Sequence, residues 1–144
     1  MATDRRAEVT WNGSLLEGSG RIDSTTSGVL GAQPLTWKAR AEDAPPGTSP
    51  EDLIAAAHAG CFAMALSHAL AEAGTPPEEL KTSATVTFQP GEGITRVALT
   101  VRGRVGGLDD AAFAAAAETA KANCPVSKAL AGVPEVTLDA RLEH

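Results

Sequence analysis

The longest run of helical periodicity in the chain covers residues 48–70. Thr48 or Ser49 can cap the start of this helix, and Gly74 follows its end. Apolar or inward-facing residues recur at intervals of three or four, as they do on one face of a helix. This predicted stripe consists of Leu53, Ile54, Ala57, Cys61, Met64, Ala65 and His68. The sequence therefore predicts a long central helix that turns the Cys61 thiol inward.

Strand-like alternation precedes this helix. Residues 7–11 alternate, Asn12-Gly13 is a turn signal, and residues 18–23 can return as the second strand of a hairpin. Residues 35–41 alternate again and predict a third strand. On that strand Arg40 would face away from Leu35, Trp37, Ala39 and Ala41.

Further elements follow the same two periodicities. A Pro45-Pro46-Gly47 loop leads into the central helix, which is followed by a second predicted hairpin, two helical segments and a last strand. These later elements are strands at 82–89 and 94–105, a helix from Asp109 or Asp110 to Asn123, a short helical turn at 126–131 and a strand at 135–142. The order βββ-α-ββ-α-β predicts an α+β fold with antiparallel sheets around the central helix. We find no repeat, and expect a single domain over residues 1–144.

Composition narrows the functional classes. The chain has 144 residues, a net charge of -6 and 43% hydrophobic residues, which is typical of a globular protein without a nucleic-acid or anionic-membrane surface. Tyrosine is absent, which argues against a base-stacking surface. The N-terminus is too polar for a signal peptide, and histidines and a serine interrupt the central helix. We therefore expect a cytoplasmic protein with no membrane and no nucleic-acid partner.

The two cysteines are the main candidates for chemistry. Two small buried residues would be the simplest interpretation of Cys61 and Cys124. However, Cys124 stands directly before Pro125 at a helix restart, where backbone N–H groups can lower its pKa. Cys61 is in mid-helix and needs a cation to stabilise a thiolate, and Arg40 is the candidate.

Such an arginine needs a carboxylate to orient it, and Glu51 fits this role chemically. Glu51 lies ten residues before Cys61, which is about 15 Å along a helix. If both serve one site, Glu51 should come from a second subunit, at a two-fold interface. The alternative is that Glu51 belongs to a capping box and accepts a backbone N–H bond.

A metal site is the third possibility. His58 and His68 flank Cys61 and could join Cys124, but the spacing matches no standard zinc motif. Local packing or hydrogen bonding is the commoner role for such histidines, so we expect no metal. Gly106-Gly107 lacks the context of a phosphate-binding loop.

Three segments of the chain closely resemble the OsmC/Ohr family of osmotically inducible and organic hydroperoxide resistance proteins. They are residues 48–66, TSPEDLIAAAHAGCFAMAL, Lys121 to Ser127, KANCPVS, and the opening Trp11-Asn12-Gly13. The resemblance covers essentially the whole chain. It is strongest to the OsmC branch, because Arg40 lies just before the helix. Arg21 is the alternative arginine.

The resemblance implies a thiol peroxidase without metal or other cofactor, acting as an intertwined homodimer with composite sites. Cys61 would attack an organic hydroperoxide and become a sulfenic acid, Cys124 would resolve it to a disulfide, and Glu51 would hold Arg40. An apolar pocket of Leu, Ile, Met and Phe side chains would favour organic over hydrogen peroxide. An external dithiol of the lipoyl type, such as one carried by a lipoylated protein, would reduce the disulfide. A non-catalytic redox sensor or small-ligand-binding dimer of the same fold is the alternative function.

Overall fold

The computed structural model of the chain describes residues 1–42 and 47–144. These residues form two compact units, Met1–Leu53 and Ile54–His144, and each unit is considered by itself. The prolines of the expected Pro45-Pro46-Gly47 loop lie outside the described residues. The expectation of a single domain over residues 1–144 stays a prediction.

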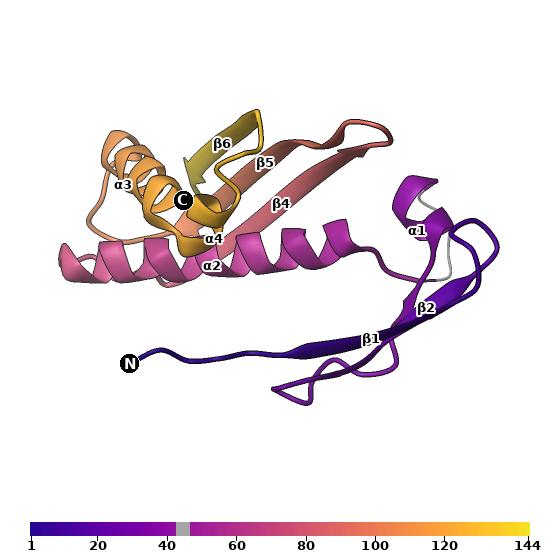
Figure 1. Ribbon diagram of the computed structural model, residues 1–144. Helices are drawn as coiled ribbons and strands as arrows, with labels where there is room; N and C mark the ends of the chain where they lie inside the picture. Colours follow the sequence, from indigo (N-terminus) through magenta and orange to yellow (C-terminus); the bar gives the residue numbers. More distant parts are fainter. Residues whose placement is uncertain (43–46) are drawn as a thin grey trace. The chain divides into compact units, whose positions relative to one another are not determined.

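The first unit contains a three-stranded antiparallel sheet in the order β1-β2-β3. Figure 1 labels the first two of these strands. The strands of this sheet are β1 (Ala7–Asn12), β2 (Ser19–Thr25) and β3 (Pro34–Leu35). The predicted opening hairpin is therefore confirmed. Trp11 pairs with Gly20, where a Cβ would lie 2.6 Å from the Trp11 ring, so glycine is what allows the indole to lie across β2.

The predicted third strand at residues 35–41 is wrong beyond its first residue. Helix α1 (Trp37–Ala41) follows β3 almost at once, because the Thr36 side chain caps it by accepting a hydrogen bond from the Ala39 N–H at 3.1 Å. Alternating apolar residues suit either structure over so short a stretch, and a threonine cap with alanines after it favours the helix. Arg40 therefore lies on a helix, not on a strand.

Helix α2 (Pro50–Glu72) begins in the first unit and continues in the second. Its cap is Ser49, whose hydroxyl accepts from the Asp52 N–H at 3.1 Å. The capping box weighed for Glu51 does not form, because the Thr48 N–H donates instead to the carbonyl of Pro34. The carboxylate of Glu51 is thereby left for a side-chain partner.

The second unit is built on a mixed three-stranded sheet in the order β4-β5-β6 (Figure 1). Its elements are β4 (Glu79–Gln89), β5 (Gly93–Arg104), α3 (Asp110–Asn123), α4 (Pro125–Ala129) and β6 (Glu135–Leu142). The predicted second hairpin, helix and last strand are all confirmed. The expectation of antiparallel sheets fails at one pair: β5 and β6 are parallel, because α3 and α4 carry the chain back across the sheet before β6 begins.

The core of the second unit lies between its helices and one face of this sheet. The buried residues of this hydrophobic core come from three elements: Phe62, Leu66 and Leu70 of α2, Val97, Leu99 and Val101 of β5, and Phe113, Ala117 and Ala120 of α3. The inward stripe predicted for α2 is therefore partly wrong. Met64 is 75% exposed and His68 is exposed, whereas His58 is buried with the large side chains four and eight residues further on. Alanines make most sides of α2 apolar, so the pattern alone could not select the buried face.

The length and mean hydropathy of α2, 1.6, would also allow it to cross a membrane. This is weak evidence, because the core helix of a globular protein meets the same criteria. In this structure Phe62, Leu66 and Leu70 of α2 are part of the hydrophobic core of the second unit, so α2 is a core helix of this kind.

Candidate active site

The two cysteines meet in the second unit. Cys61 lies in the middle of α2, and Cys124 lies between α3 and α4. Their sulfur atoms are hydrogen-bonded at 2.9 Å, and both are free thiols. Cys124 is completely buried, whereas Cys61 is partly exposed. Two thiols 63 positions apart in the sequence are thus close enough for a disulfide to form with a small movement.

The surroundings of the two sulfurs are unequal. Burial raises the pKa of the Cys61 thiol, the hydrogen bond that it shares with Cys124 raises it further, and the Val126 N–H only partly offsets these effects. Burial also raises the pKa of Cys124, but hydrogen bonds from Cys61, from the Ser127 N–H and hydroxyl and from the Val126 N–H outweigh it. The pKa of Cys124 is therefore lowered. Within this unit Cys124 is therefore the thiol that ionises more easily, as expected for a cysteine before a helix restart.

His58 approaches the pair from α2. Its Nε2 lies 2.7 Å from the Ser127 hydroxyl, and the ring is fully buried, which lowers its pKa. Its Nδ1 has no hydrogen-bond partner among the described residues. His68, the other histidine weighed as a ligand, is exposed beside Glu72. Residues 1–42 and 47–144 contain no group of three potential metal ligands, and the absence of a metal stays a prediction.

Arg40 and Glu51 meet in the first unit. Arg40 Nε donates to Glu51 Oε1 at 2.9 Å, and Nη2 donates to Oε2 at 3.1 Å. The Glu51 side chain is 8% exposed and that of Arg40 33%. The structure thus brings together the arginine and the carboxylate that the sequence suggested, within one chain. Arg21, the alternative arginine, is 64% exposed and pairs with Asp23 at 2.7 Å.

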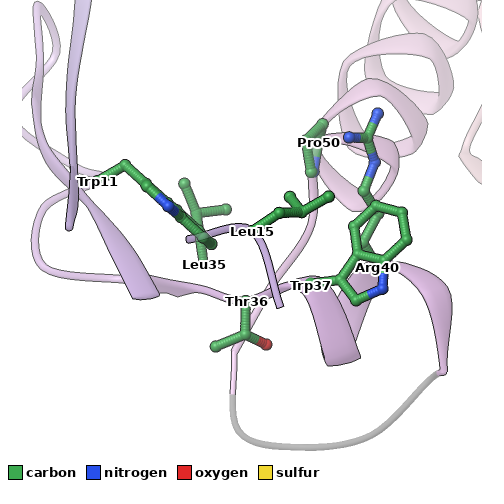
Figure 2. A pocket seen from close by; sticks show the side chains of 7 residues that line it. All are labelled: Trp11, Leu15, Leu35, Thr36, Trp37, Arg40 and Pro50. Atoms are coloured by element: carbon green, nitrogen blue, oxygen red, sulfur yellow. The ribbon is translucent and has the colours of Figure 1, made fainter. Parts of the chain in front are cut away.

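A cavity of about 350 Å³ adjoins Arg40 in the first unit (Figure 2). Its lining is mostly apolar and consists of Trp11, Leu15, Leu35, Thr36, Trp37, Arg40 and Pro50. The sequence suggested an apolar pocket but not these residues. Both tryptophans of the chain line it, and so does Leu15, which interrupts the alternation after the first strand. Leu15 could have been identified from the sequence, because it is an apolar residue that interrupts the alternation of the strand.

Chemically, the second unit offers a thiol pair able to pass reversibly between dithiol and disulfide. The first unit offers an apolar cavity with one fixed cation at its wall, which suits a small molecule with an apolar tail and a polar end.

The chain is similar to proteins of known family and known structure. The family model described as OsmC-like protein matches residues 41–139. The chain is 42% identical over 146 residues to "Peroxiredoxin OsmC" of Escherichia coli (strain K12), with 99% of each chain covered, and equally to that of Shigella flexneri.

Solved structures extend the likeness. The organic hydroperoxide resistance protein OhrB of Bacillus subtilis is 28% identical, with a TM-score of 0.64 and with 96% of this chain and 98% of that chain covered. An organic hydroperoxide resistance protein from Elizabethkingia anophelis, 24% identical, has a TM-score of 0.69, with 99% of this chain and 100% of that chain covered. The second likeness bears on the fold alone.

Proposed function

This chain belongs to the OsmC-like protein family, and on that ground we propose that it is a thiol-dependent peroxidase that reduces organic hydroperoxides to alcohols. The similarity to proteins named peroxiredoxin OsmC supports a peroxide-reducing redox protein. The observation that carries the thiol mechanism is the pair of free sulfurs, Cys61 and Cys124, 2.9 Å apart.

The reaction would begin at Cys61, the more exposed of the two thiols. The Cys61 thiol first releases its proton to water, and the thiolate attacks the terminal oxygen of the hydroperoxide. The O–O bond breaks, and the alkoxide that leaves takes a proton back from water and becomes the alcohol. Cys61 becomes a sulfenic acid. The Cys124 sulfur then attacks the Cys61 sulfur, the S–O bond breaks, and water leaves as the disulfide forms.

A thiolate on Cys61 needs a positive charge nearby, because its pKa is raised by burial within the unit. Arg40 supplies that charge in the proposal, and Glu51 holds the guanidinium in place. Glu51 and Cys61 are ten residues apart on α2, about 15 Å along its axis. We therefore place the ion pair of one chain at the thiols of a second, in a homodimer with composite sites.

The cavity beside Arg40 would bind the organic tail of the substrate. Burial of apolar groups is worth about 25 cal/mol per Å², and hydrogen peroxide has no such group to bury. Organic hydroperoxides should consequently be reduced faster than hydrogen peroxide. An external dithiol, of the lipoyl type or carried by a lipoylated protein, would restore the thiols, in a cytoplasmic protein that needs no cofactor or metal.

The test is stoichiometric. Reduced protein is mixed with one equivalent of cumene hydroperoxide, and free thiols and the alcohol product are counted. Loss of two thiols per chain with one alcohol formed is expected, and retention of both thiols would refute the proposal. Repeated turnover with a dithiol separates the peroxidase from a redox sensor, which would form the disulfide without turnover.

A further inference from the structure

The polar ring of His58 is buried with one of its two nitrogen atoms lacking a hydrogen bond, which is energetically unfavourable. Its ring is completely buried, and only Nε2 has a partner among the described residues, the Ser127 hydroxyl at 2.7 Å. Burying a polar atom without a hydrogen bond costs about 1–3 kcal/mol. The proposed peroxidase chemistry does not use this histidine, so another role should explain the cost.

The hydrogen-bond pattern indicates which way the protons point. A neutral imidazole carries one N–H, and buried N–H groups without a partner are rarer than buried acceptors without one. The unpartnered Nδ1 is therefore best assigned as the lone pair, and Nε2 as the N–H that donates to Ser127. The Ser127 hydroxyl then has its own proton to donate elsewhere. Its recipient is the Cys124 sulfur, which the Ser127 side chain hydrogen-bonds.

We propose that His58 and Ser127 are positioning residues that make Cys124 the leaving thiol when the Cys61–Cys124 disulfide is reduced, which directs the reductant to Cys61. The inference rests on the proposed function, since it concerns the second half of that cycle. It extends the cycle by naming the sulfur that is attacked and the side chains that select it.

The step is a thiol–disulfide exchange with a dithiol reductant. A reductant thiolate attacks the Cys61 sulfur, the S–S bond breaks, and its electron pair goes to Cys124 as a thiolate that accepts the Ser127 hydrogen bond. The second thiol of the reductant, as a thiolate, attacks the reductant sulfur bound to Cys61. A cyclic disulfide leaves, and Cys61 is released as a thiolate that takes up a proton.

Two observations favour this direction over the reverse. Cys61 is partly exposed whereas Cys124 is completely buried, so an external thiol reaches Cys61 first. A thiol that is stabilised as its thiolate also leaves faster. Hydrogen bonds to the Cys124 sulfur, including the one from the Ser127 hydroxyl, lower the pKa of this thiol.

The experiment compares Ser127→Ala with Ser127→Thr, which keeps the hydroxyl. Each protein is oxidised with diamide, which contains no peroxide bond, and the rate of disulfide cleavage by dithiothreitol is measured. Ser127→Ala should slow cleavage roughly three- to tenfold, and Ser127→Thr should stay near wild type. In a Cys61→Ser background, the ultraviolet thiolate absorbance should show the Cys124 pKa rising by about one unit in Ser127→Ala.

Mapping the adduct tests the direction of attack. Oxidised protein treated with glutathione should carry the mixed disulfide on Cys61, with Cys124 free. His58→Gln, which keeps an N–H near the position of Nε2, should retain more of the cleavage rate than His58→Leu. Ser127→Ala alone decides the matter if the histidine variants fail to fold.

An unchanged cleavage rate and Cys124 pKa in Ser127→Ala, or an adduct on Cys124, would overturn the inference. None of these readouts needs peroxide. A protein that fails to consume cumene hydroperoxide but shows the expected exchange would refute only the proposed function, and the opposite result would refute only this inference.

Discussion

Arg40 and Glu51 are joined by two hydrogen bonds, from Nε to Oε1 at 2.9 Å and from Nη2 to Oε2 at 3.1 Å. Two bonds between a planar guanidinium and a planar carboxylate fix the orientation of both groups. Arg40 comes from α1 and Glu51 from the first turn of α2, so the pair also links these two helices. Such a cation is suited to hold a reacting group in a defined direction.

The geometry of this pair should matter more than its charge. Arg40→Lys keeps a positive charge but loses the planar guanidinium that makes two parallel hydrogen bonds to Glu51. Charge-assisted hydrogen bonds are worth about 1.5–3 kcal/mol. We expect the initial rate of cumene hydroperoxide consumption to fall about 10- to 100-fold. Arg21→Lys is the matched control, since Arg21 is exposed beside Asp23. A larger loss in Arg21→Lys than in Arg40→Lys would move the role to Arg21.

Replacing Cys61 and replacing Cys124 should have different effects on peroxide consumption. Cys61→Ser should abolish peroxide consumption, because the attacking sulfur is gone. Cys124→Ser should permit one turnover and then leave Cys61 as a sulfenic acid that excess peroxide oxidises further. Mass spectrometry of the intact chains after peroxide treatment distinguishes these products. Equal behaviour of the two variants would contradict the assigned roles.

The sequence predicted most elements of the fold because their signals are local. Alternation in β4 and β5 and the aspartate start of α3 were sufficient, and Asp109 does cap α3 by accepting from the Ala112 N–H. The prediction of a strand at residues 35–41 was wrong because the only local signal for a helix there is the Thr36 cap, which is weaker than the alternating pattern. The parallel pairing of β6 depends on where α3 and α4 return the chain, which no local pattern records.

The candidate site was predictable by residue type but not by arrangement. Cys61, Cys124, Arg40 and Glu51 were named from their chemistry and from the family resemblance. His58 was weighed as a metal ligand, and its bond to Ser127 joins positions 69 apart in the sequence. Contacts of this length depend on tertiary packing, which single-sequence periodicity does not contain.

The exposed side of α2 should be an interface between two copies if the proposed homodimer forms. Met64 is 75% exposed in the chain alone, and a large exposed apolar side chain on a core helix suggests association. Met64→Glu should leave folding intact and shift the protein from dimer to monomer in sedimentation equilibrium. Val29→Glu, at a residue 79% exposed in the first unit, is the control and should leave the association state unchanged. A wild-type monomer would refute the dimer outright.

Gly103 of β5 should tolerate no side chain. A Cβ there would lie 2.7 Å from Cζ of Phe113, in the core between β5 and α3. Gly103→Ala should lower the free energy of unfolding by about 1–3 kcal/mol, as overpacking does. Gly106→Ala, where nothing lies within 4 Å, is the matched control. Urea unfolding measures both, and similar midpoints would show that Phe113 moves aside at little cost.

His58 should make the fold sensitive to mild acid. Burial lowers its pKa in the folded chain from the ordinary 6.5, so the unfolded chain binds a proton first as the pH falls. The contribution of neutral His58 to the free energy of unfolding is complete above about pH 6.5. It is lost as the pH falls toward the pKa of the folded chain, by at most about 1.4 kcal/mol per pH unit. Asp23 and Asp139, whose pKa values are lowered from 3.8, act only in more acidic solution. Urea unfolding between about pH 7.5 and 5.5 should therefore show a steeper loss of stability in wild type than in His58→Gln, and equal slopes would mean that His58 is solvated or charged in the folded protein.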